Sequence, residues 1–290
     1  MKAHLFSPLL IMLGFASIAC AQSTTAHVVG RNVSGMKRYA KMYKQENLGK
    51  SDYTCVYNYE VKIPESKSDR ILKDQMILVA NKEVSLFLRY SSYQTDSVIN
   101  LRNREKITIQ EYDSIKSLFP NGYNISTNIY KYHSKSILKE RGRVFTDNYI
   151  YSETIPSFVW QMSDETEIIQ GHSCHLSRMH FRGRDWKIWY ADDIPLSDGP
   201  WKFCGLPGLV LKAESEDGEI SFSAIWVAKR NVDILCNITE KSDFKTTREK
   251  YLKFLKQYKS TPASLMAGTV EVEGGLKKAS SLPYNPIEKE

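Results

Sequence analysis

The side chains that could bind a metal ion are concentrated in one central stretch of the sequence, at His172, Cys174, His175 and His180. Because successive side chains of a strand point to opposite faces, His172 and Cys174 would share a face while His175 would point away. Local spacing therefore supplies two ligands, fewer than the three or four protein ligands of a zinc site. We predict no cofactor, and a copper or zinc site at His172 and Cys174 is the alternative interpretation.

The candidates for nucleophilic and acid–base catalysis are equally isolated. Cys204 would need a neighbouring base and a lowered pKa to act as a nucleophile. Asp192 and Asp193 would diverge in a strand, and a turn before Pro195 accounts for them better. The sequence contains no H-E-x-x-H, G-x-S-x-G or C-x-x-C motif. We predict no catalytic residues, and an enzyme of unrecognised type is the alternative.

The five tryptophans are the remaining side chains that could form a binding site. They could line a hydrophobic or carbohydrate-binding site, but packing in the core is the commoner role of such large side chains. They are Trp160, Trp186, Trp189, Trp201 and Trp226.

The first 21 residues place this chemistry outside the cytoplasm. Lys2 supplies a positive charge, an apolar stretch covers Leu5 to Ala19, and Ala19-Cys20-Ala21 forms an A-x-A cleavage site. We predict a cleaved signal peptide over residues 1–21 and a location in the periplasm, at the outer membrane or outside the cell. A lipidated Cys20 is the alternative, although Ser17 stands where a bulky aliphatic residue is expected.

The charge of the chain limits its partners. The formal net charge is +7, or +6 once Lys2 is removed. For an exported protein the natural anionic partners are membrane head groups or surface polysaccharide, and nucleic acid is excluded. Ordinary solvated faces are the other interpretation of the four basic clusters, which are Arg102 to Lys106, Lys131 to Arg143, Arg182 to Lys187 and Lys241 to Lys259.

The elements that must position these side chains are mainly strands. Alternation predicts a strand over 53–63, and Asn81-Lys82-Glu83 separates two strands of a hairpin. Helical spacing predicts helices over 107–119 and 244–258. We therefore expect a loosely ordered segment over 22–52, a single β-rich domain over 53–260 and a tail without fixed structure over 261–290.

Two further hairpins are predicted in the centre of the chain. In the first, a four-residue loop would place Phe181 opposite Trp186 and Met179 opposite Ile188. In the second, the Asp217-Gly218 turn would pair Ala213 with Phe222, Leu211 with Ala224 and Leu209 with Trp226, so that all six side chains share one buried face.

The second hairpin also suggests how the cysteines pair. Four cysteines survive signal cleavage, an even number that predicts two disulfides in an oxidising compartment. Cys204 precedes the first strand of the hairpin and Cys236 follows the second, so both lie beyond its open end. Of the three connectivities, we favour Cys204–Cys236 with Cys55–Cys174.

The segment before this hairpin, residues 199–210, is rigid by composition. Pro207 fixes its own φ and pushes Leu206 toward extended backbone, while Gly205 and Gly208 permit positive φ or close backbone approach. No phosphate-binding G-x-G-x-x-G or Walker pattern is present. A structural entry into the strand is therefore favoured over a ligand loop.

These residues also carry a resemblance to a known family. The pattern comprises Arg182, Gly183, Arg184, Trp186, Trp189, Tyr190, Gly199, Pro200, Gly205, Leu206, Pro207, Gly208 and Leu209, and the sequence closes on Tyr284 to Glu288. It resembles the GLPGLI family of bacterial cell-envelope proteins over about residues 53–240, with Val210 in place of the final isoleucine. The resemblance implies an envelope protein and assigns no catalytic residue.

Together these observations predict a mainly β (α+β) protein with a curved antiparallel sheet and a few helices, by analogy an open half-barrel. The function that fits them is non-enzymatic binding of an apolar ligand or of an envelope protein partner.

Overall fold

The protein is described by a computed structural model that covers residues 45–65, 68–102, 106–119, 122, 127–238, 243–262 and 281–289. All of them belong to the compact unit Arg38–Glu290. The predicted signal peptide and most of the segment 22–52 lie outside the described residues.

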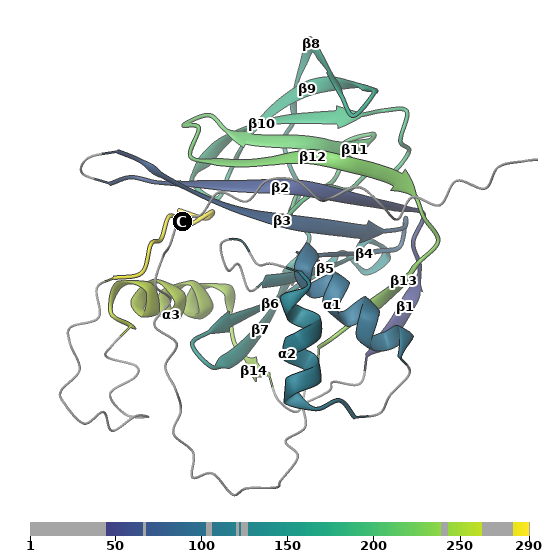
Figure 1. The fold of residues 1–290 in the computed structure, drawn as a ribbon. Helices are drawn as coiled ribbons and strands as arrows, with labels where there is room; N and C mark the ends of the chain where they lie inside the picture. The colour runs from purple at the N-terminus through teal and green to yellow at the C-terminus, as the bar shows by residue number, and fades with distance from the viewer. Residues whose placement is uncertain are drawn as a thin grey trace, which may run out of the picture. The chain divides into compact units, whose positions relative to one another are not determined.

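One twelve-stranded sheet dominates the described part of the chain (Figure 1). Its hydrogen-bonded order is β14-β7-β6-β5-β4-β3-β2-β12-β11-β10-β9-β8, open at β14 and β8 and antiparallel except for the β14–β7 pair. The bounds are β2 Tyr53–Ile63, β3 Arg70–Ala80, β4 Val84–Arg89, β5 Thr127–Tyr132, β6 Ile137–Val144, β7 Asp147–Thr154, β8 Gln161–Ile169, β9 His172–Phe181, β10 Arg184–Ala191, β11 Leu209–Ser215, β12 Ile220–Lys229 and β14 Phe244–Lys245. A separate pair joins β1 (Glu46–Lys50) to β13 (Asp233–Cys236). The mainly β prediction is confirmed.

Three α-helices and one short 3₁₀-helix (His133–Lys135) accompany the sheet in the described part of the chain. The predicted helix over 107–119 is α2 (Ile109–Ser117), which begins at a capping box between Thr108 and Glu111. The predicted C-terminal helix is α3 (Arg248–Ser260). Helix α1 (Tyr90–Leu101) is not predicted, because its sequence has a weak apolar face and follows β4 directly. Within the described residues, no helix has the length and apolarity needed to cross a membrane.

The apolar core lies on both faces of the sheet. Val56 and Tyr57 are neighbours on β2, yet they belong to different buried clusters because alternate side chains face opposite ways. The cluster with Tyr57 joins side chains from β2, β6 and β10, so the sheet twists around a shared core (Figure 1). The cluster with Val56 is covered by β13 and β1.

The β9–β10 hairpin forms with a different register from the predicted one. Trp186 pairs with Met179, and Arg184 pairs with Phe181 across a turn of Arg182 and Gly183. Both turn residues have positive φ, at 54° and 73°, as a two-residue type I′ turn requires. A shift of two residues leaves each side chain on its predicted face, which is why the face pattern could not reveal the error.

The β11–β12 hairpin confirms one predicted pair and overturns another. Ala213 pairs with Phe222 as predicted. A β-bulge between Ala224 and Trp226 shifts the alternation by one residue, so Trp226 is 37% exposed and lies opposite Val56 of β2. Leu209 is fully buried but pairs with Ala191 of β10. The predicted Leu209–Trp226 contact is therefore wrong.

The C-terminal tail also differs from expectation. Residues 281–289 lie against the folded chain, where Leu282 N donates a hydrogen bond to Lys259 O at 2.7 Å. Figure 1 shows this segment in yellow between α3 and the strands β2 and β3. The sequence gives no periodic pattern here because the contacts are made by single side chains and carbonyl groups.

Candidate functional site

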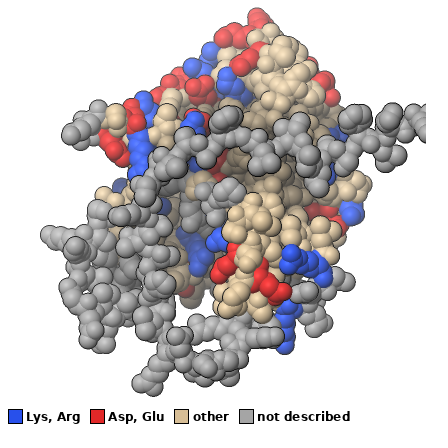
Figure 2. Space-filling view, viewed as in Figure 1, with Lys and Arg blue, Asp and Glu red and all other residues tan. Residues whose placement is uncertain are grey.

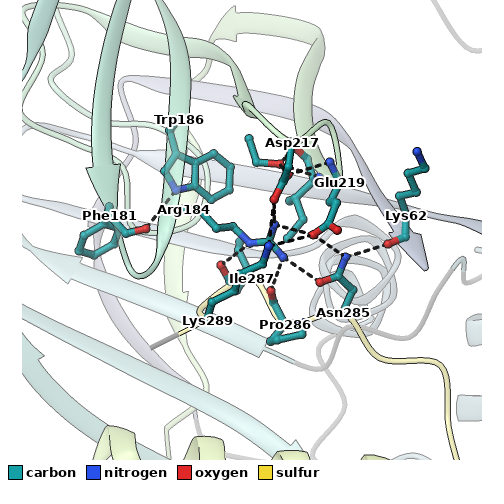
Figure 3. Close-up of polar contacts among 12 residues, drawn as sticks. Lys62, Phe181, Arg184, Trp186, Asp217, Glu219, Asn285, Pro286, Ile287 and Lys289 are labelled. Carbon is teal, nitrogen blue, oxygen red and sulfur yellow. Dashed lines mark hydrogen bonds and ion pairs between the residues drawn. The ribbon is translucent and has the colours of Figure 1, made fainter. Parts of the chain in front are cut away.

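Arg184 is the centre of a buried polar cluster (Figure 3). It is the first residue of β10, and its side chain has no exposed surface. The guanidinium donates to Asp217 at 2.7 Å and to Glu219 at 2.8 Å, both in the β11–β12 turn. It also donates to Asn285 Oδ1 at 2.8 Å and to the carbonyl groups of Pro286 at 2.7 Å and Ile287 at 3.2 Å. A single arginine thereby joins the hairpin turn to the C-terminal segment.

Lys202 is the centre of a second buried cluster. Its ammonium lies 2.7 Å from Glu153 and 2.6 Å from Glu288, and it donates to the Tyr151 hydroxyl at 3.0 Å. Glu140 lies 3.3 Å from the same ammonium. Burial disfavours the charged lysine, but the surrounding carboxylates outweigh burial and raise the pKa of Lys202. The charge of Lys202 is therefore stabilised without solvent.

Arginines complete this second cluster from two other elements. Arg182 of the β9–β10 turn contacts Glu153 at 2.7 Å. Arg248, the first residue of α3, donates to Glu288 at 2.8 Å. Burial raises the pKa of Glu288, which the neighbouring cations oppose. Strand, turn, helix and C-terminal segment are thus held at one point.

A cavity of 610 Å³ lies beside these two clusters. The sheet contributes aromatic side chains to its wall, including Tyr59, Phe87 and Phe222. Helix α3 contributes Leu252 and Leu255. The C-terminal segment completes the wall with Leu282, Tyr284 and Ile287. Charged side chains, including Arg89, Asp96, Glu140 and Arg143, also line it, so the wall is mixed in polarity. The volume is that of a small-molecule binding site.

The segment 199–210 encloses a third buried charge cluster. Lys131 of β5 has no exposed surface, is paired with Asp198, and donates to the carbonyl groups of Gly199 at 2.8 Å and Phe203 at 3.1 Å. His133 lies 2.8 Å from the same carboxylate. Burial opposes ionisation of Asp198, yet Lys131 and His133 lower its pKa to about 2.

Two glycines allow the segment 199–210 to pack against the neighbouring part of the chain. A Cβ at Gly208 would lie 2.0 Å from the Ala191 carbonyl oxygen, and Gly205 has a φ of +94°. A second cavity of 600 Å³ lies beside Gly205 and is lined by polar and aromatic residues, including His133, Phe158, Trp160, Ser197 and Cys204. Close packing at Gly208 and the backbone conformation at Gly205 therefore require glycine, and one side of the segment faces a cavity.

Both predicted disulfides are absent, since Cys55, Cys174, Cys204 and Cys236 are free and buried. Cys55 on β2 and Cys174 on β9 are four strand positions apart in the sheet. At ~4.8 Å for each step this is roughly 19 Å along the sheet, whereas a disulfide needs Cα atoms within about 7 Å.

Cys204 and Cys236 are separated by the sheet itself. The residue after Cys236, Asn237, donates to the Tyr130 hydroxyl, and the carbonyl before Cys204 accepts from Lys131. Tyr130 and Lys131 are adjacent on β5 and point to opposite faces. Burial raises the pKa of the Cys204 thiol to about 11, which keeps it protonated and unsuited to nucleophilic attack.

The histidine group does not converge. His172 lies 2.6 Å from Asp193, His175 lies 3.5 Å from Asp192, and His180 lies 2.7 Å from Asp185. Cys174 is buried and its thiol donates to the His172 carbonyl at 3.6 Å. Among the residues that the structure describes, no three His, Cys, Asp or Glu side chains are grouped to hold a metal ion.

The aromatic residues of the motif serve the core. Trp186 is fully buried, with its ring centroid 5.8 Å from that of Trp201 and 4.9 Å from that of Phe203. Trp189 and Tyr190 are also buried. The face in Figure 2 shows lysines and arginines interspersed with aspartates and glutamates. The clusters at Arg184, Lys202 and Lys131 were missed from sequence, because buried charges far apart in the chain leave no local pattern.

Comparisons with known proteins bear on the family and the fold. A family described as "Protein of unknown function (Porph_ging)" matches residues 181–212, the stretch that holds Arg184, Lys202 and the segment 199–210. No curated protein matches the sequence.

Two crystal structures of PNGF-II, in space groups P21 and C2, are similar to this chain with TM-scores of 0.48 and 0.47. The sequences are 13% and 14% identical over 71% of this chain and 34% or 33% of the PNGF-II chain. This chain therefore spans about a third of that protein's length.

Proposed function

We propose that this protein is an exported, non-enzymatic binding protein whose 610 Å³ cavity holds an apolar or amphipathic ligand. The cavity carries the proposal. Its volume falls within the ~300–1,000 Å³ of pockets that enclose small ligands, and its wall combines aromatic side chains of the sheet with leucines of α3. Export is inferred from residues 1–21 of the sequence.

We also infer that the chain is of the GLPGLI type. The motif from Gly205 to Val210 and the match over residues 181–212 support this inference. Arg184 of the motif and Lys202 within the matched stretch hold the segment that completes the cavity wall. In this proposal the motif residues maintain the structure of the binding site and do not contact the ligand.

Binding can be tested with cis-parinaric acid, a fluorescent fatty acid, and the full mature chain. We expect saturable binding that Leu255→Glu weakens at least tenfold, because Leu255 lines the cavity and its replacement would place a carboxylate against the hydrocarbon part of the ligand. Phe254→Glu is the matched control on the same helix, since Phe254 is 41% exposed and does not line the cavity. Equal effects of the two substitutions, or no saturable binding by the unmodified chain, would contradict the proposal.

The natural ligand can be sought in protein taken from its own envelope. Native mass spectrometry should show the mature chain with additional mass from lipid. A chain of bare mass, or one carrying stoichiometric copper or zinc, would favour the alternatives that the sequence left open.

A further inference from the structure

Residues 281–289 contact the protein as a bound peptide would. They form no helix and no strand, and one end of the segment lies beside α3 through the hydrogen bond from Leu282 N to Lys259 O. Lys259 and Leu282 are in contact although 22 residues separate them in the sequence. Fully extended, the intervening residues would reach up to about 70 Å, enough to present the segment to a neighbouring molecule.

The contacts are specific for the side chains of this segment. The Asn285 side chain donates to Lys62 O at 2.8 Å and accepts from Arg184 at 2.8 Å (Figure 3). An asparagine amide is both donor and acceptor, so it satisfies both partners at once. The carbonyl groups of Pro286 and Ile287 accept from the same arginine. The Ile287 side chain packs against the main core cluster.

The two residues that follow add complementary charge. Glu288 lies between Lys202 and Arg248, at 2.6 Å and 2.8 Å. Lys289 N donates to the Arg182 carbonyl at 2.9 Å, and its ammonium lies 3.0 Å from Asp217. A carboxylate followed by a lysine thus meets cations and then a carboxylate, which fixes the direction of the peptide as well as its register.

The receiving side chains are preorganised by other partners. Arg184 also binds Asp217 and Glu219, which belong to the β11–β12 turn. Lys202 also binds Glu153 and the Tyr151 hydroxyl. These cations would keep carboxylate partners if the segment left, so its departure would not strand an isolated buried charge. A site that needs little rearrangement binds its peptide at low entropic cost.

We propose that Arg182, Arg184, Lys202 and Arg248 form a peptide-docking site that binds residues 285–289 reversibly and accepts the same segment from a second copy of this chain. The recognised chemistry is an asparagine amide, two carbonyl groups, an aliphatic side chain, a carboxylate and a lysine, in that order along the peptide. The proposal does not depend on what occupies the cavity.

The test uses the full mature chain with a protease recognition sequence inserted between Gly274 and Gly275. After cleavage, we expect the chain to keep its circular dichroism spectrum and to exchange its C-terminal fragment for a fluorescent peptide of residues 279–290. Peptides with Asn285→Ala or Glu288→Gln should bind at least tenfold more weakly. A peptide with Ser281→Ala should bind within twofold of the unmodified one, because Ser281 is exposed.

The second copy is tested by mixing the cleaved chain, freed of its fragment, with uncut chain. Native mass spectrometry should then show a one-to-one complex that is lost when the uncut chain carries Asn285→Ala. Unfolding upon cleavage, a fragment that leaves only on denaturation, or equal affinity of all four peptides would overturn the docking site. Peptide exchange without the one-to-one complex would overturn the second copy as its partner.

Discussion

Two lysines without exposed surface, Lys131 and Lys202, are held in different ways. Lys131 is paired with one carboxylate, Asp198, and with two carbonyl groups, all within the segment 198–203. Lys202 is surrounded by Glu140, Glu153 and Glu288, of which the last belongs to the C-terminal segment.

The two clusters respond differently to the loss of a partner. Removing either Lys131 or Asp198 leaves the other charge buried without its partner, so this cluster belongs to the permanent fold. Lys202 keeps two carboxylates when Glu288 is removed. Lys202 can therefore lose Glu288 and remain paired, as a reversible contact requires.

The largest effect is expected at Lys131. Lys131→Met should lower the free energy of unfolding by about 3–5 kcal/mol, because the buried Asp198 carboxylate would lose its ammonium partner and keep the His133 ring and the Gly199 N–H. Lys73→Met is the control, since Lys73 is 66% exposed and pairs with Glu60 at the surface; its effect should be below about 1 kcal/mol. Equal losses in denaturant unfolding would show that burial at Lys131 is unimportant.

An intermediate effect is expected from acid. The pKa of Asp198 is lowered from 3.8 to about 2, so the folded state binds this proton less readily than the unfolded chain. The stabilisation is fully present above about pH 4 and is lost as the pH falls toward 2, at about 2 kcal/mol in all. Comparison of unfolding free energies at pH 4.5 and 2.5, for the unmodified chain and for Asp198→Asn, measures it. The same acid-induced loss in the variant would exclude Asp198 as its source.

The smallest effect is expected at Glu288. Glu288→Gln keeps the shape of the side chain but removes its charge beside Lys202 and Arg248, and should cost about 1–2 kcal/mol. Glu249→Gln is the control because Glu249 is 74% exposed and lies 3.7 Å from Arg248; it should leave the free energy of unfolding nearly unchanged. A loss as large as that of Lys131→Met would remove the distinction between the two clusters.

Local features could be predicted because their causes are local. Helical spacing within residues 107–119 predicts α2, and the Asp217-Gly218 turn sets the pairing of Ala213 with Phe222. The pairing of Leu209 with Trp226 failed because the bulge in β12 arises from the fit between β12 and β2, which are more than 150 residues apart in sequence. The sequence near Trp226 contains no local signal that predicts this bulge.

The β-rich class, the faces of the two central hairpins as far as Ala224 and the rigidity around Pro207 follow from the sequence alone, since alternation, turn residues and fixed dihedral angles act within a few residues. The strand order, the free cysteines and the contacts of Arg184 and Lys202 with the C-terminal segment depend on tertiary packing. Twelve strands can be ordered in many ways that bury the same apolar faces. Charges are buried only where partners from distant segments meet them, and that meeting exists only in the folded chain.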